Sequence, residues 1–310
     1  MKSINNKAFS LIELSIVILI IGILVVGVTQ SSRLAKAMRL QTARSLTLSS
    51  PVPSFKNVTL WLESTADESF YSDEAQDQLQ ISTWKDINPQ SSFKSNATQS
   101  NSSFKPKYVS DGINGLPAIS FDGADDWMTM GVVSGFESNS KFTIFIVFKP
   151  TNLGRFVISK QDNAVDGKGW AVITTGNYNG GGATTSNLLS FGLKGHQSAN
   201  FIEIASLATI LNKNIVASFS YNGGLNNSGL NVYVNNNKDL APLRVGGPLS
   251  LLSSPNGDED LRIGAREGNS FGWFQGLIGE IIIIESFLND ADVGEVNKYL
   301  QKKWSIKENL

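Results

Sequence analysis

The sequence predicts a long N-terminal α-helix, then an all-β sandwich of the jelly-roll type, and finally a C-terminal helix. Three observations predict this order. Residues 11–28 form an aliphatic run that one charged residue interrupts. Short runs rich in Val, Ile, Phe and Tyr then recur about every ten residues between Gly, Asn, Asp and Ser, as in sandwiches. Apolar residues within 290–304 follow the period of a helix.

The composition excludes several classes of chemistry. The 310 residues include no Cys and one His, His196. The chain therefore has no disulfide framework and no thiol chemistry, and its composition argues against a histidine metal cage or a Ser-His-Asp triad. Residues 1–50 contain six basic residues and one acidic residue, so they carry +5 and the remainder −6 of the net −1. An acidic body argues against nucleic-acid binding.

The first helix is expected over residues 9–50. Its apolar part, about 9–28, approaches the ~20 residues that a membrane-spanning helix needs. Residues 31–48 contain neither Gly nor Pro and mix apolar with basic side chains, so the helix continues in amphipathic form. Prolines at 51 and 53 end it. We therefore expect a linker over 51–57 and a separate domain over 58–310.

Glu13 is the single charge inside the apolar run. A carboxylate within a membrane-spanning segment costs a few kcal/mol unless it is paired, which points to a function. The alternative is that Glu13 lies near the lipid headgroups and is hydrated. Lys2 and Lys7 precede the run and favour a cytoplasmic N-terminus.

Residues 7–24 read K-A-F-S-L-I-E-L-S-I-V-I-L-I-I-G-I-L, which resembles the N-terminus of type IV prepilins and type II secretion pseudopilins. The resemblance implies a leader peptide, residues 1–8, that prepilin peptidase removes between Ala8 and Phe9. It also implies N-methylation of Phe9 and a pairing of Glu13 with the terminal amine of a neighbouring subunit. Ala8 departs from the family, which usually has Gly before the cut.

Two other interpretations of the N-terminus remain open. A secretory signal would end at the A-x-A sequence 35–37, but this sequence lies well beyond the apolar run, and the run is long for a signal core. The second alternative is an uncleaved membrane anchor. The mature N-terminus distinguishes the three interpretations, because it would be methylated Phe9, Met38 or Met1.

The body of the chain is expected to be all-β with one terminal helix. A hairpin is expected around 222–229, and Asn289 or Asp290 can cap the helix, which should pack on an edge of the sandwich. The helix carries an apolar stripe of Val293, Val296, Leu300 and Trp304. The clearest strands are 58–62, 118–121, 142–148, 156–159, 170–174, 188–193, 215–221, 230–234, 261–263 and 277–285.

Two stretches of the body carry a second resemblance. Residues 112–128 read G-I-N-G-L-P-A-I-S-F-D-G-A-D-D-W-M. Residues 261–304 begin with L-R-I-G-A-R, continue with F-Q-G-L-I-G-E-I-I-I-I-E-S-F-L-N-D-A-D and end in Y-L-Q-K-K-W. They look like laminin-G-like, concanavalin-A-like jelly-roll modules of bacterial surface proteins. The resemblance implies a fold for 58–310 but no ligand, because this superfamily includes lectins, protein-binding modules and hydrolases.

No catalytic constellation is evident, so the chain is not expected to be an enzyme. A glycosidase needs two carboxyl groups facing each other across a groove. Glu280 and Glu285 lie five positions apart on one expected strand and therefore point to opposite faces. A degraded glycosidase that uses Glu280 is kept as an alternative.

Tryptophan and aspartate supply the remaining site candidates. Trp127 and Trp273 stand next to Asp and Gly and are candidates for stacking on a sugar, whereas the other four Trp residues lie in apolar patterns typical of a core. No cofactor is certain, and calcium is the one candidate, because laminin-G-like modules often hold it. Its candidate ligands, which are equally typical turn residues, are Asp122, Asp125, Asp126, Asp258 and Asp260.

These observations favour a pilin-like filament subunit, minor or tip-located, whose lectin-like head serves adhesion. The expected partners are prepilin peptidase, other pilin-like subunits, the inner membrane, and a glycan or surface protein. The precursor would lie in the inner membrane and the mature chain in a surface or periplasmic filament of a Gram-negative bacterium. The alternative is a membrane-anchored binding module that never polymerises. The sequence does not separate pilus from secretion pseudopilus.

Overall fold

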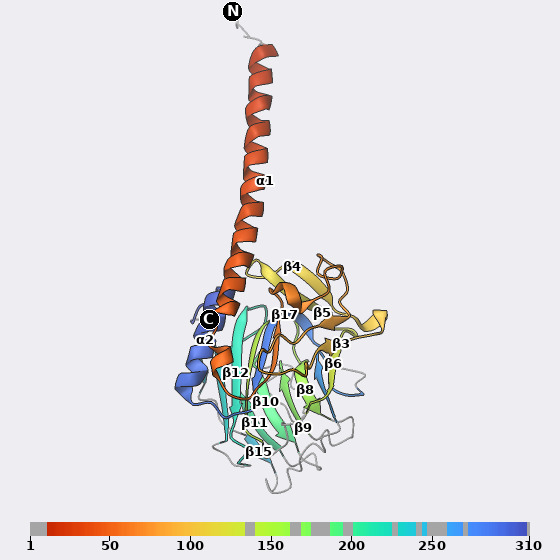
Figure 1. The fold of residues 1–310 in the computed structure, drawn as a ribbon, viewed down its shortest axis with the longest axis vertical. Helices are drawn as coiled ribbons and strands as arrows, with labels where there is room; N and C mark the ends of the chain where they lie inside the picture. Colours follow the sequence, from red (N-terminus) through yellow and green to blue (C-terminus); the bar gives the residue numbers. More distant parts are fainter. Residues whose placement is uncertain are drawn as a thin grey trace, which may run out of the picture. The chain divides into compact units, whose positions relative to one another are not determined.

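The N-terminal part of the chain is one helix, α1 (Leu11–Leu48). The computed structural model describes residues 11–133, 140–161, 169–174, 187–194, 201–224, 229–239, 244–246, 259–268 and 272–308. The chain forms two compact units, Met1–Thr42 and Ala43–Leu310 (Figure 1).

In the first unit, α1 has the length and composition of a membrane span. The segment Leu11–Ser54 contains an 18-residue window with a mean hydropathy of 3.0, none of it buried within the protein. Ser15 and Ser31 donate their hydroxyl protons to backbone carbonyls one turn earlier, at 2.7 and 2.8 Å. These bonds satisfy polar groups within the helix itself, which an apolar solvent requires.

The second unit begins inside the last turns of α1. Ala43 and Thr47 are 1% and 7% exposed, and Ala43 belongs to a hydrophobic cluster of this unit. The segment expected as a linker, 51–57, contains a short 3₁₀ helix, η1 (Val52–Ser54), whose Val52 is fully buried. The end of the helix and the segment that follows are therefore part of the sandwich unit.

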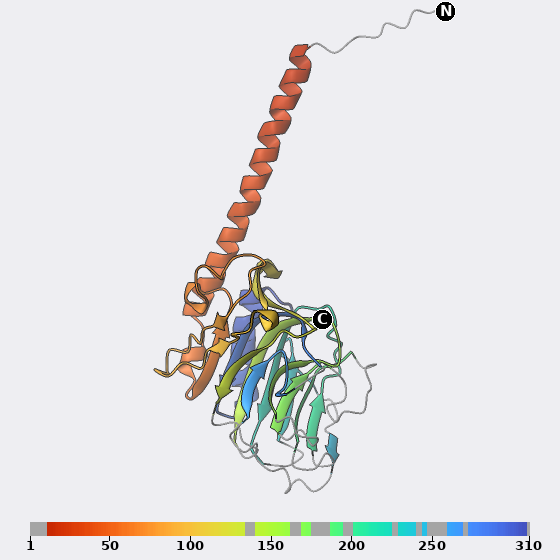
Figure 2. The ribbon, with the colours of Figure 1, turned by 90° about the vertical axis from the view of Figure 1, so that its right-hand side faces the viewer.

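Two antiparallel sheets form the sandwich, and they face each other in Figure 2. Sheet A has the order β14-β13-β12-β7-β17-β5-β4, and β1 pairs with β17. Its strands are β1 (Val58–Glu63), β4 (Lys107–Ile113), β5 (Leu116–Asp122), β7 (Phe142–Pro150), β12 (Ile215–Tyr221), β13 (Leu230–Val234), β14 (Asn237–Asp239) and β17 (Gln275–Ile284).

Sheet B has the order β15-β11-β10-β9-β8-β16-β6-β3-β2. Two further 3₁₀ turns, η2 (Asp67–Ser69) and η3 (Ser102–Phe104), lie in the connections. The strands of sheet B are β2 (Thr83–Trp84), β3 (Ala97–Thr98), β6 (Met128–Val132), β8 (Phe156–Gln161), β9 (Gly169–Ile173), β10 (Ser190–Lys194), β11 (Phe201–Ala205), β15 (Arg244–Gly246) and β16 (Asp260–Ile263).

Aromatic side chains fill the space between the sheets. Phe142 of sheet A contacts Trp170 and Phe191 of sheet B, with ring centroids 5.5 and 6.0 Å apart. The four tryptophans expected in the core are buried there or under the outer face of sheet A: Trp61, Trp84, Trp170 and Trp304. Apolar burial thus holds the sandwich together without disulfides.

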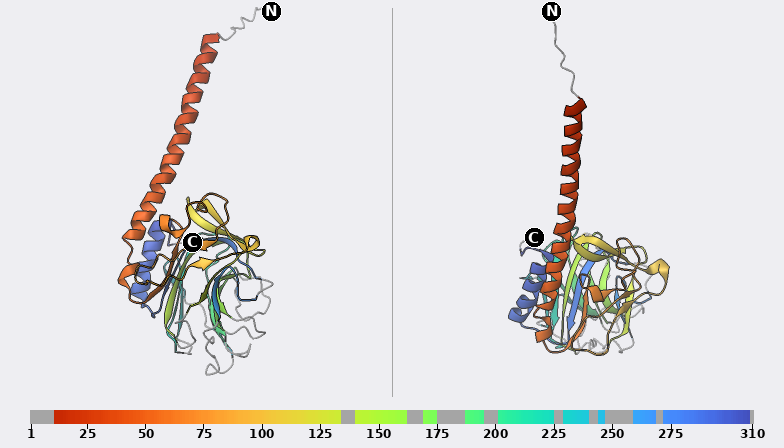
Figure 3. Two further views of the ribbon diagram at one scale, coloured as in Figure 1. Left: turned by 45° about the vertical axis from the view of Figure 1, so that its right-hand side comes forward. Right: turned by 45° about the horizontal axis from the view of Figure 1, so that its top comes forward.

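The C-terminal helix, α2 (Asp290–Trp304), begins as expected at Asn289, whose side chain accepts hydrogen bonds from two backbone N–H groups. Its expected position at a sandwich edge is wrong, because α2 covers the outer face of sheet A (Figure 3). Outward side chains of the central strands are apolar, for example Phe145, Val216 and Ile282. Strands that are apolar on both faces need a second layer.

Candidate functional site

A pocket of about 230 Å³ opens beside β16 and β6, on the outer side of sheet B. It contains both tryptophans that the sequence offered for stacking on a sugar. The residues that line this arginine–tryptophan pocket are Phe104, Asp125, Trp127, Arg262, Ala265, Arg266, Gly268 and Trp273.

Strand alternation places Arg262 in this pocket. Its neighbours Leu261 and Ile263 are fully buried between the sheets, so Arg262 points to the opposite face. Trp127, just before β6, is fixed by its backbone, because its N–H donates to the carbonyl of Phe104 at 3.1 Å. Trp273 forms a parallel bridge with Phe156 at the start of β8.

Aromatic rings hold the two guanidinium groups. Arg262 Cζ lies 4.5 Å from the ring centroid of Trp127, and Arg266 Cζ lies 5.7 Å from that of Phe156. Arg262 Nη2 is also 3.3 Å from a carboxylate oxygen of Asp260. A planar cation stacked on an aromatic face and paired at one end has little rotational freedom left.

An acidic turn lies next to the pocket. Asp122, Asp125 and Asp126 each offer a carboxylate oxygen within 4.8 Å of the others. Asp122 Oδ1 accepts the backbone N–H groups of Ala124, Asp125 and Asp126, and Asp126 Oδ2 accepts the N–H of Asp122 at 2.9 Å. Burial, followed by the charge of Asp122, raises the pKa of Asp126 to about 7.

This turn has the hard oxygen donors that calcium uses, so its residues fit the expected cation in kind. Its geometry is nevertheless that of an aspartate turn, and the turn's own N–H groups occupy two of the oxygens. Asp260 pairs with Arg262 instead, and Asp258 lies outside the described residues. Calcium at Asp122, Asp125 and Asp126 remains a prediction.

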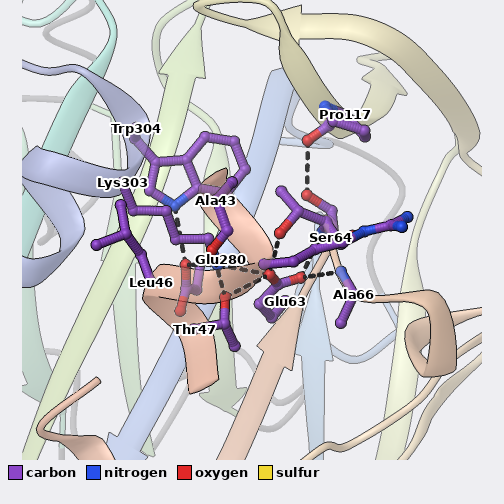
Figure 4. A network of polar contacts seen from close by, with 12 residues as sticks. Ala43, Leu46, Thr47, Glu63, Ser64, Ala66, Pro117, Glu280, Lys303 and Trp304 are labelled. Atoms are coloured by element: carbon purple, nitrogen blue, oxygen red, sulfur yellow. Dashed lines mark hydrogen bonds and ion pairs between the residues drawn. The ribbon is translucent and has the colours of Figure 1, made fainter. Parts of the chain in front are cut away.

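Sequence reasoning missed a second polar cluster, buried under α2 (Figure 4). Lys303 of α2 places Nζ 2.5 Å from Glu63 Oε1 and 2.8 Å from Glu280 Oε2. All three side chains are fully buried. The polar surroundings of Glu280 are thus made by other buried side chains.

Each carboxylate of this buried ionic cluster also receives neutral donors. Glu280 accepts hydrogen bonds of 2.8 to 2.9 Å from the side chains of Trp61, Tyr299 and Trp304. Glu63 accepts bonds from the hydroxyl of Thr47, from the N–H and hydroxyl of Thr65, and from the N–H of Ala66.

Hydrogen bonding and charge decide the protonation of Glu63. Burial by itself would raise the pKa of its carboxyl, but the Lys303 ammonium and the bonds from Lys303, Thr65 and Ala66 outweigh burial and lower the pKa. Burial and the nearby carboxylates raise the pKa of Tyr299 well above its usual value. The lowered pKa favours the ionised form of Glu63, and hydrogen bonds from within the protein engage both carboxyl groups, unlike a catalytic carboxylate that is accessible to substrate.

The remaining predicted residues lie elsewhere. Glu285 is exposed just after β17, as expected for a solvated strand end. Glu13 lies on an exposed face of α1 in the first unit. Ala8, Phe9 and His196 lie outside the described residues.

Comparison with known proteins gives one family match. Residues 4–29 match the Prokaryotic N-terminal methylation motif, a range that includes Ala8, Phe9 and Glu13. No curated protein matches the chain.

Solved structures share the β-sandwich at low sequence identity. The binding domain of Paraclostridial Mosquitocidal Protein 1 has a TM-score of 0.51 and 15% identity, over 78% of this chain and 52% of that chain. The present chain thus spans about half of that protein. Domain 4 of AbnA, a GH43 extracellular arabinanase from Geobacillus stearothermophilus solved with arabinotriose, has a TM-score of 0.50 and 14% identity, over 78% and 98%. The chain therefore carries a prepilin-type N-terminal methylation motif joined to a jelly-roll β-sandwich.

Proposed function

We propose that this chain is a pilin-like subunit whose β-sandwich head binds glycans in the arginine–tryptophan pocket. The observation that carries the proposal is a combination. A methylation motif stands at one end of the chain, and Trp127 and Trp273 meet in one pocket of the head. The head is large for a subunit that packs at every position of a filament, which favours a minor or tip-located role.

The N-terminus supports assembly into a filament. The motif implies cleavage by prepilin peptidase, which would free the amine of Phe9 for methylation. Glu13 follows Phe9 by one helical turn, so its carboxylate can pair with the terminal amine of a neighbouring subunit. The precursor would then lie in the inner membrane and the mature chain in a surface or periplasmic filament.

Mass spectrometry of the natively expressed chain tests assembly. We expect the mature polypeptide to begin at methylated Phe9, and Glu13→Ala to be cleaved normally but absent from sheared filaments. Glu68→Ala, which removes an exposed carboxylate of the head, is the matched control and should assemble. A mature chain that begins at Met1 and stays in the membrane would instead show the non-polymerising anchored module.

The head supports glycan binding through its indole rings. Trp127 and Trp273 are half-buried and line the pocket, so each keeps exposed apolar surface for a sugar, and Asp125, Arg262 and Arg266 can exchange hydrogen bonds with hydroxyl groups. A glycan array probed with the full chain in detergent tests this role. Trp127→Ala and Trp273→Ala should each weaken the best ligand at least tenfold. Phe93→Ala removes an aromatic side chain that is 89% exposed and should change nothing.

Binding without hydrolysis is the expected chemistry. Glu280, the carboxylate that a degraded glycosidase would use, is 1% exposed and accepts bonds from three neutral side chains and Lys303. A sugar could not reach it without displacing α2. Release of reducing sugar from a bound glycan, abolished by Glu280→Gln in a folded protein, would contradict this proposal.

A further inference from the structure

We propose that the arginine–tryptophan pocket selects glycans that carry a carboxylate, such as those ending in a uronic or nonulosonic acid, over their neutral counterparts. The inference rests on the proposed function, because it names the ligand class of the same pocket. Three observations support it: the two cations of the lining, the positioning of Arg262, and the hydrogen-bonding capacity that Arg262 has left.

The lining has more cationic than anionic side chains. It contains two arginines, Arg262 and Arg266, and one carboxylate, Asp125. A neutral sugar needs donors and acceptors but no excess of either charge. Two guanidinium groups beside indole rings instead offer a planar, charged fork to a carboxylate and stacking surfaces to the sugar ring. Asp125 remains as an acceptor for a ring hydroxyl.

Arg262 is positioned before any ligand arrives. Its Cζ lies 4.5 Å from the Trp127 ring centroid, and Asp260 holds Nη2 at 3.3 Å. Positioning of this kind reduces the entropy lost when a ligand binds.

Arg262 also keeps unused donors. A guanidinium has five N–H donors, and the contact with Asp260 engages one nitrogen. Its Nε is buried and has no hydrogen-bond partner among the residues that the structure describes. A ligand carboxylate is a strong acceptor for the guanidinium N–H groups of a residue that lines the pocket.

Arg266 supplies the second cation from a different element. It follows the turn at Gly264, in which the N–H of Gly264 donates to Val157 at 3.0 Å and its carbonyl accepts from Phe274 at 2.8 Å. The side chain is partly exposed and lies beside the ring of Phe156. Arg266 can therefore be replaced with less risk to the fold than Arg262.

Binding of matched ligand pairs tests the inference. The probes are galacturonic-, glucuronic- and sialic-acid-terminated oligosaccharides, each beside its methyl ester, which keeps the shape and removes the charge. They are titrated against the full chain in detergent. We expect the best acidic ligand to bind at least tenfold more tightly than its ester, with a preference that shrinks as salt is added.

Variants locate the preference. Arg266→Gln should weaken the acidic ligand at least tenfold and its ester less than threefold. Arg262→Lys keeps the charge but loses the planar fork, so it should give an intermediate loss. Lys298→Gln removes one exposed positive charge from α2 and is the control that should leave both affinities unchanged.

The outcomes separate the two proposals. Equal affinity for acid and ester, with both lost in Trp127→Ala, would overturn the acidic preference and leave glycan binding intact. An acidic preference that Lys298→Gln reduces as much as Arg266→Gln would show general charge attraction and would also overturn it. A folded chain that binds none of the acidic and neutral glycans would end both proposals.

Discussion

On the outer side of sheet A, α2 covers Glu63, Glu280 and Lys303, which form ion pairs with one another inside the protein. On the outer side of sheet B, two arginines stand in a pocket that α2 does not line, and Nε of Arg262 has no hydrogen-bond partner among the described residues. Both faces contain charges beside tryptophan rings. The two faces differ in what pairs with these charges. On sheet A the protein's own side chains pair with them, whereas on sheet B we propose that a ligand does.

The largest effect on the free energy of unfolding is expected for the buried ionic cluster between α2 and sheet A. Lys303→Met would leave Glu63 and Glu280 buried without their cation, and loss of one partner of a buried ionic cluster costs about 3–5 kcal/mol. Urea unfolding of the full chain at pH 7 measures the change. Lys302→Met, on the exposed neighbour, should change stability by less than about 0.5 kcal/mol. An equal effect of the two variants would show that the cluster stabilises nothing.

The pKa of Glu63 sets the direction in which the contribution of the Glu63–Lys303 ion pair to stability changes with pH. The folded pKa of Glu63 is lowered, so its contribution to stability is present above the unfolded value of 4.5 and is lost as the pH falls through the folded pKa. The penalty of Lys303→Met should therefore shrink at pH 3, where the carboxyl group of Glu63, left without its cation, is protonated.

An intermediate effect tests how closely α2 fits sheet A. A Cβ at Gly279 would lie 2.4 Å from Cη2 of Trp304, whose indole donates to Glu280. Gly279→Ala should therefore displace the ring and cost about 1–3 kcal/mol, as overpacking does. Gly294→Ala, where a Cβ would meet nothing closer than 3.5 Å, is the matched control and should be neutral or stabilising. Near-ultraviolet circular dichroism of the tryptophans would show the displacement directly.

The smallest effect on stability is expected at Asp126, in the acidic turn next to the arginine–tryptophan pocket. The folded pKa of Asp126 is about 7, above the ordinary value of 3.8, so the folded state loses stability as the pH rises from about 4 to 7. Asp126→Asn keeps an oxygen for the N–H of Asp122 and removes the titration. Relative to the native chain it should gain on the order of 1–2 kcal/mol between pH 4 and pH 8. Thermal unfolding across this range measures the gain.

Calcium changes the expected sign of that result. A cation bound at Asp122, Asp125 and Asp126 would stabilise the native chain above pH 7, and Asp126→Asn would then be destabilising in calcium and stabilising in a chelator. Unfolding curves that do not respond to calcium would remove the cation and leave the aspartate turn.

The sequence could predict the parts of the fold that local pattern determines. The ten expected strands all occur, and the run of isoleucines 281–284 lies in the centre of sheet A. Strand β4 has a mostly exposed side-chain pattern, K-Y-V-S-D-G-I, and gave no alternation to detect. The position of α2 was missed because the apolar run of β17 does not say which layer covers its second face.

The arginine–tryptophan pocket and the buried ionic cluster also differ in how far the sequence could predict their residues. Trp127 and Trp273 were detectable because each aromatic residue stands beside turn residues, but the arginines that share their pocket were not. Glu63, Glu280 and Lys303 gave a signal that went unused: each is a charge within an apolar strand or on a helix that packs on the sheet, and a charge in such a position needs a partner. Their pairing depends on tertiary structure.

The last turns of α1 make two side-chain hydrogen bonds to residues in β1 and directly after it. The hydroxyl of Thr47, in the last turn of α1, donates to Glu63 at 3.0 Å, and Arg44 Nε donates to the carbonyl of Thr65 at 2.8 Å. Within the second unit, the last turns of α1 are therefore bonded to β1 and the segment after it by side chains, in addition to the chain connection through residues 49–57.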